Sequence, residues 1–110
     1  MTNPHAGEVA LVIEGERRVM KLTLGALAEL EAALGADTLV ALIERYENGE
    51  FATRDVLALL LAGLRGGGWE GSATDLAQAD IAGGPIAAAQ AAAQLLARAF
   101  TLPETTRDGL

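Results

Sequence analysis

The stretch from residue 86 to residue 100 constrains the fold most, because as a helix it would be apolar on nearly every side. Its polar side chains recur at every fourth residue: Gln90, Gln94 and Arg98. They form one narrow stripe, and Ala, Leu, Ile and Phe occupy the other faces. Pro85 fits the first position of such a helix, where a missing N–H costs no hydrogen bond. We predict a helix to about Thr101 with neighbours on more than one side.

The rest of the chain is also suited to packed helices. It is 51% hydrophobic but only 4% aromatic, and Ala and Leu supply most of the apolar side chains, which favours closely packed helices over a sheet sandwich. A chain of 110 residues fits one domain. We predict a single globular domain over residues 8–102, between a flexible leader, 1–7, and a flexible tail, 103–110.

Two short segments near the amino terminus alternate as strands do. Residues Glu8 to Glu14 and Arg17 to Thr23 are predicted to form a hairpin that turns at Gly15-Glu16 and places Glu14 opposite Arg17. This register puts five apolar side chains on one face: Val9, Leu11, Ile13, Met20 and Leu22. A lone hairpin would be marginal, so we expect it to rest on helices.

Helical periodicity and capping residues follow the hairpin. The predicted helices begin at Thr23, Asp37, Thr53 and the Ser72/Asp75 pair. The first helix runs to Leu34 and places Leu24, Leu27, Leu30 and Leu34 inward. The second places Leu39, Leu42, Ile43 and Tyr46 inward, with Glu44, Arg45 and Glu47 opposite. The third is expected to be central and carries Val56, Leu57, Leu59, Leu60, Leu61 and Leu64, and the fourth is short and ends near Ile81. The predicted fold class is α+β, mainly α: an N-terminal antiparallel β-hairpin packed on a bundle of about five helices.

Charge and composition argue against several classes of partner and location. Formal net charge is -7 and Lys21 is the only lysine, which argues against DNA or RNA as a direct partner. There is no cysteine, and residues 1–7 lack the features of a signal peptide. The run from Ile81 to Ala89 is far shorter than the roughly 20 residues that span a bilayer. We expect a cytoplasmic protein without a membrane segment.

The sequence offers little for catalysis. Ser72 is the only serine and His5 the only histidine, and cysteine is absent, so neither a nucleophilic triad nor a His/Cys metal cluster is expected. The glycine-rich run from Gly66 to Gly71 lacks the Lys-Ser or Lys-Thr of a phosphate-binding loop. We predict no enzyme activity, no cofactor, no metal and no catalytic residue.

Five stretches together resemble a known family. They are Asn3-Pro4-His5 with Gly7-Glu8-Val9, the run from Leu22 to Glu31, Phe51 with Arg54-Asp55-Val56, the run from Gly63 to Gly68, and the run from Ala92 to Phe100. In this order they are similar to the gene transfer agent proteins of alphaproteobacteria, which are encoded among phage-like tail genes and grouped with phage tail-assembly chaperones. These are packing and turn residues, so they indicate the family rather than a chemistry.

The resemblance implies a non-enzymatic binding protein that assists assembly of a phage-like tail, as a chaperone for the tape-measure or tail-tube protein. One alternative is a structural subunit of the tail, located in the particle; a second is a small ligand-binding domain. A chaperone needs an apolar surface for its client. We place that surface on the last helix and the preceding loop, at Trp69, Ile86, Ala89, Ala93, Leu96 and Phe100.

Two of these features have a second interpretation. The ring of Trp69 would equally fold back over the core, and this interpretation is favoured over an exposed anchor. Small residues on the last helix would permit close packing within the domain or between chains, so a homo-oligomer is an alternative to a client complex.

Overall fold

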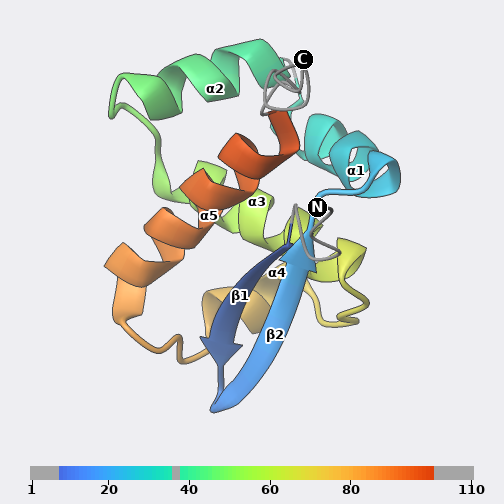
Figure 1. The fold of residues 1–110 in the computed structure, drawn as a ribbon, viewed down its shortest axis with the longest axis vertical. Helices are drawn as coiled ribbons and strands as arrows, with labels where there is room; N and C mark the ends of the chain where they lie inside the picture. Colours follow the sequence, from blue (N-terminus) through green and yellow to red (C-terminus); the bar gives the residue numbers. More distant parts are fainter. Residues whose placement is uncertain (1–7, 36–37, 101–110) are drawn as a thin grey trace, which may run out of the picture.

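The computed structural model describes residues 8–35 and 38–100. Its elements are β1 (Glu8–Ile13), β2 (Glu16–Lys21), α1 (Leu24–Leu34), α2 (Leu39–Glu47), α3 (Thr53–Gly66), α4 (Ala73–Ala77) and α5 (Gly84–Phe100). Figure 1 shows α3 running through the middle of the molecule, with α1, α5 and the hairpin around it and α2 at one end. The predicted fold class is confirmed. The predicted leader, the whole predicted tail and the predicted cap Asp37 lie outside the described residues, and the predicted domain bounds stay a prediction.

The hairpin turns one residue earlier than its sequence predicts. Glu14 and Gly15 are the two turn residues, with φ of 52° and 79°, as a two-residue hairpin turn of the mirror-image type requires. Ile13 therefore pairs with Glu16, and Val9 pairs with Met20 rather than with Leu22. The predicted turn at Gly15-Glu16 is wrong. The predicted apolar face survives, because the pairing shifts by two residues and so preserves which side chains point the same way.

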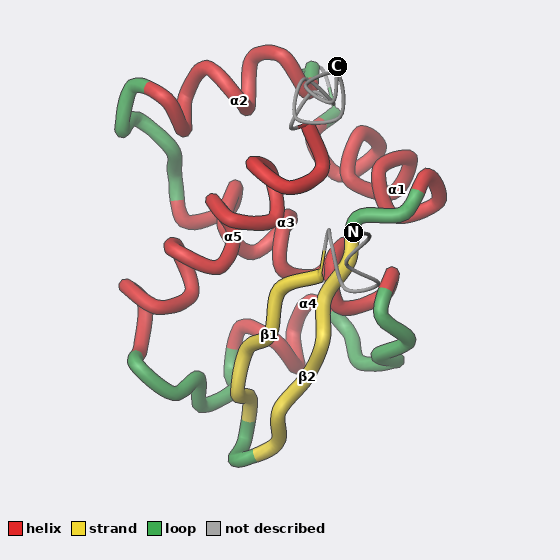
Figure 2. The backbone as a smooth tube through the Cα atoms, in the orientation of Figure 1, coloured by secondary structure: helices red, strands yellow, loops and turns green. Residues whose placement is uncertain are grey.

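A third segment explains why Glu14 tolerates its positive φ. The Glu14 N–H donates to the Asp80 carbonyl at 2.8 Å, and the Asp80 N–H donates to the Glu14 carboxylate at 2.8 Å. The Ala82 N–H donates to the Val12 carbonyl at 3.0 Å. The loop between α4 and α5 thus runs beside the end of β1 (Figure 2), and these bonds hold the turn in place.

Helix α3 carries the centre of the core, as predicted. Leu59, Leu60 and Leu64 have no exposed surface, and α3 packs against α1, α4, α5 and β2. The apolar face of the hairpin joins the same core through Val9, Leu11, Ile13 and Met20. Burial of each such side chain stabilises the fold by about 1.5–3 kcal/mol before the entropy of ordering is subtracted.

Two predicted helix starts are confirmed and two are corrected. The Thr23 hydroxyl accepts from the Ala26 N–H, and Ser72 and Asp75 exchange the two bonds of a capping box. Helix α2 is capped by Thr38. Helix α3 begins after Ala52, whose N–H is satisfied by the Asp55 carboxylate, so Thr53 is its first residue rather than its cap.

Two other details differ from prediction. Leu24 is 85% exposed, because the inward face of α1 is centred on Ala26 and Leu30 and Leu24 lies nearly on the opposite side of the helix. Helix α4 ends at Ala77 rather than near Ile81, because the segment that follows it pairs with β1.

The outer edge of β2 is covered by the end of α3. A Cβ atom on Gly66 would collide with the Lys21 carbonyl oxygen, and one on Gly67 would collide with the Val19 carbonyl oxygen. The sequence predicts this glycine run only as a helix end and loop. Its first two glycines also let two backbones approach closely. A covered strand edge is protected against pairing with other chains.

We expect Gly67→Ala to lower the free energy of unfolding by about 1–3 kcal/mol, because neither backbone can move aside without disturbing the core. Urea denaturation followed by circular dichroism measures the change. Gly25→Ala is the matched control: its Cβ would meet nothing closer than Thr23 Oγ1 at 3.9 Å, and in a helix it should stabilise by up to about 1 kcal/mol. Equal effects of the two substitutions would contradict the close approach.

Candidate partner-binding surface

Helix α2 is held to the domain by its buried Leu42 and by a partly buried ion pair. The backbone of α2 does not pack closely along any other described element. Arg45 instead donates from Nε to Asp55 Oδ2 at 3.0 Å and from Nη2 to Asp55 Oδ1 at 2.8 Å. The Asp55 side chain is 2% exposed and that of Arg45 25%. This two-pronged geometry fixes the angle between α2 and the start of α3.

Arg45 is predicted to lie opposite the apolar stripe of α2, and its ion pair with Asp55 is not part of that prediction. Its place on α2 is opposite the apolar stripe by periodicity, but its long side chain reaches back to a carboxylate beyond the α2–α3 loop. Burial alone raises the pKa of Asp55, yet hydrogen bonds from Arg45 and the Ala52 N–H, with the charges of Arg45 and Arg54, hold that pKa below its usual value. Asp55 is thus an anionic anchor rather than a proton donor near neutral pH.

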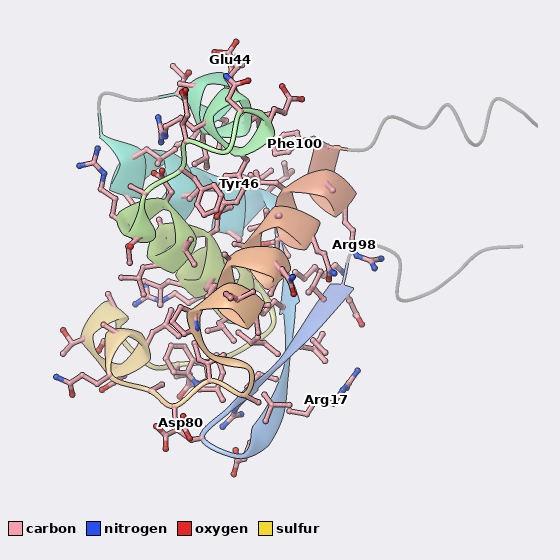
Figure 3. The ribbon with its side chains drawn as sticks, turned by 90° about the vertical axis from the view of Figure 1, so that its left-hand side faces the viewer. Arg17, Glu44, Tyr46, Asp80, Arg98 and Phe100 are labelled. Carbon is pink, nitrogen blue, oxygen red and sulfur yellow. The ribbon has the colours of Figure 1, made fainter. Side chains whose placement is uncertain are left out.

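An aromatic pair sits beside this anchor. The rings of Tyr46 and Phe51 are stacked, with centroids 4.3 Å apart and an angle of 7° between the planes. The Tyr46 hydroxyl is buried without a hydrogen-bond partner among the described residues. Burial and the nearby Asp55 charge raise the pKa of this hydroxyl. In Figure 3 the Tyr46 ring points from α2 into the space toward α3 and α5.

An apolar hollow opens between α2 and α5. It measures about 370 Å³ and is called the α2–α5 hollow below. Its lining residues are Ile43, Tyr46 and Glu47 from α2, and Ala93, Leu96, Ala97 and Phe100 from α5. Both sets follow helical spacing, so each helix contributes one stripe. Small alanines on α5 face larger side chains on α2, and this leaves space between the helices.

A second hollow lies at the other end of α5. It measures about 510 Å³ and is called the α3–α5 hollow. Its lining is mainly apolar and comes from α3, α4, the loop after α4 and the start of α5, including Val56, Leu57, Ile86 and Ala89. Ile86 is 72% exposed, so an apolar side chain projects at the edge of this hollow.

The six predicted partner-binding residues do not form one surface. Ala93, Leu96 and Phe100 line the α2–α5 hollow, whereas Ile86 and Ala89 line the α3–α5 hollow. Trp69 lies away from both, in a polar depression beside the hairpin turn, and is half-buried against the core. Their assignment to a partner stays a prediction. Sequence reasoning missed Ile43, Tyr46 and Glu47, because helix periodicity does not say which helices face one another.

The match to a protein family decides the class of this chain. Residues 6–101 match the model of a family described as "Phage tail tube protein, GTA-gp10". The chain belongs to this family. Comparison with curated proteins gives no significant match, and comparison with solved structures gives none either.

Membership in the GTA-gp10 tail tube family confirms the predicted gene transfer agent and phage tail connection. The family description is that of a structural component rather than an enzyme, and it supports the structural-subunit alternative better than the chaperone function. Within residues 8–35 and 38–100, no three His, Cys, Asp or Glu side chains are grouped to hold a metal ion. None of the helices described is long and apolar enough to cross a membrane.

We expect Asp55→Ala to lower the free energy of unfolding by about 3–5 kcal/mol at neutral pH, because it removes the buried carboxylate that accepts two hydrogen bonds from the Arg45 guanidinium and one from the Ala52 N–H. Urea denaturation at several pH values measures this. Since the folded-state pKa of Asp55 is depressed, its stabilisation is complete above the unfolded-state pKa of about 3.9 and is lost as pH falls through the lower, folded-state pKa.

The difference between the wild type and Asp55→Ala should therefore shrink below about pH 4. Arg98→Ala is the control, because Arg98 is exposed, and it should change stability by less than about 0.5 kcal/mol. A loss for Asp55→Ala as small as that of the control would contradict the anchoring role.

We expect Tyr46→Phe to preserve or raise the free energy of unfolding, by up to about 1–2 kcal/mol, because it removes a buried hydroxyl that has no partner among the described residues. The stacked ring is kept, so the packing on Phe51 should be unchanged. Thermal and urea denaturation measure the effect. A clear loss of stability would mean that the hydroxyl makes a hydrogen bond in the folded protein.

Proposed function

We propose that this protein is a non-enzymatic structural subunit of a phage-like tail and that it binds other tail proteins through apolar hollows on α5. Family membership carries the proposal. The fold supports it, because one helix supplies part of the lining of two solvent-open hollows while its inner face, with Ala92 and Leu95, completes the core.

Exposed apolar side chains at these hollows favour protein contacts. Ile86 is 72% exposed and Phe100 38% exposed. Aromatic and aliphatic residues that project beside a pocket are common anchors of protein interfaces. The predicted partners are the tape-measure and tail-tube proteins, and the predicted surface residues keep their roles in this proposal. Trp69 is the weakest member of that set, because its ring already packs on the core.

The hollows do not favour the alternative of a small ligand-binding domain. The α2–α5 hollow has Glu47 as its one charged lining residue, and the α3–α5 hollow has Asp80. Sites for small ligands combine apolar walls with several converging polar groups. The lining found here resembles the surface that receives a helix or an extended segment of another protein.

A chaperone of tail assembly is the second candidate. The two open apolar hollows favour it, because a chaperone shields apolar segments of its client before assembly. The two functions differ in the fate of the chain. A subunit remains in the finished particle, whereas a chaperone leaves when its client assembles.

We expect the chain in finished particles at a constant ratio to the other tail proteins, because subunit contacts are repeated in every tail. Quantitative mass spectrometry of particles washed at high salt measures the ratio, with a cytoplasmic protein of the same cells as the control. Recovery of the tagged chain with the tape-measure or tube protein from cell extract, together with its absence from washed particles, would replace the subunit with the chaperone.

A further inference from the structure

Three acidic side chains lie in or near the α2–α5 hollow along the chain. Glu47 lines the hollow, and Glu44 and Glu50 are exposed near it along the chain. The ion pairs within residues 8–35 and 38–100 involve none of these three. The Arg45 guanidinium on the same helix is held by Asp55. Figure 3 shows Glu44 on α2, Phe100 at the end of α5 beside α2, and Arg98 pointing away from α2.

A helix end adds to this negative field. The hollow is lined in part by the last turn of α2, where the aligned peptide dipoles of the helix leave partial negative charge. Acidic side chains at the end of α2 are unfavourable for that helix, since basic side chains are preferred there. A cation brought to Glu44 and Glu47 by a partner would relieve this repulsion.

We propose that the α2–α5 hollow binds a segment of another tail protein that carries an apolar anchor residue flanked by Lys or Arg. The anchor enters between Tyr46 and Phe100, and the basic flank meets Glu44 and Glu47. The inference rests on the proposed function, because it takes the partner from the same particle. A second copy of this chain is a poor occupant, because each copy has a net charge of -7 and brings the same acidic rim.

The experiment uses the full-length chain and overlapping synthetic peptides that cover the sequences of the other tail proteins of the same particle. Fluorescence anisotropy measures their binding at low and high salt. We expect the bound peptides to share an apolar residue with neighbouring Lys or Arg, and their affinity to fall as salt rises. Bound peptides without basic residues, or no bound peptide at all, would overturn the proposal.

Paired variants separate this site from general charge and fold effects. Glu47→Lys should weaken binding by about tenfold or more, whereas Glu31→Lys, exposed on α1 and with the same change of net charge, should weaken it less than about threefold. Ala93→Trp fills the hollow from an exposed position and should abolish binding. Gln94→Trp, also exposed on α5 and not among the hollow's lining residues, should retain it. Circular dichroism checks that each variant is folded.

The remaining outcomes distinguish a failure of this proposed site from a failure of the proposed subunit function. Analytical ultracentrifugation that finds a dimer lost in Ala93→Trp would overturn the proposal in favour of a second copy. Peptide binding that depends on Glu47, with the chain absent from finished particles, would support this site and reject the structural-subunit function. If the chain is present in particles but Glu47→Lys and Ala93→Trp leave its peptide binding unchanged, this site is rejected and the subunit function is retained.

Discussion

The close approach of α3 to the edge of β2 is the contact on which the rest of the fold depends. Gly66 and Gly67 bring the end of the central helix against the carbonyl groups of Lys21 and Val19. At the same helix, a Cβ on Gly63 would lie 2.7 Å from Leu95 Cδ1, so α5 also packs closely there. Small residues at these points let a two-stranded hairpin, which would be unstable alone, share one core with the helices.

The position of α2 depends on a different kind of contact. Leu42 is its fully buried side chain, but its orientation is set by the Arg45–Asp55 pair and by the stack of Tyr46 on Phe51. Polar and aromatic contacts of this sort fix direction without filling the space between helices. The same arrangement therefore attaches α2 at its carboxyl end and leaves an apolar hollow open between it and α5.

Local signals in the sequence predict most elements, and contacts between distant segments explain the errors. Thr23 and the pair Ser72 and Asp75 mark helix starts through bonds within a few residues, and these starts are confirmed. The last helix begins at Gly84, one residue before the predicted Pro85. The hairpin turn was misplaced because Glu14 depends on Asp80, which is 66 residues away. The Arg45–Asp55 pair was missed because periodicity does not reveal a carboxylate ten residues further along the chain. The hollows could not be predicted, since no single helix contains both of their walls.

The acidic side chains of α2 are difficult to explain by stability alone. Glu44 and Glu47 lie in the last turn of a nine-residue helix, where they repel the helix dipole, and neither forms an ion pair within the described part of the chain. The basic residue of that turn is Arg45, which is committed to Asp55. A general need for solubility would be met as well by acids placed at the starts of helices, where they stabilise. Acids placed beside an apolar hollow instead give it a preference among apolar segments, favouring those that carry positive charge.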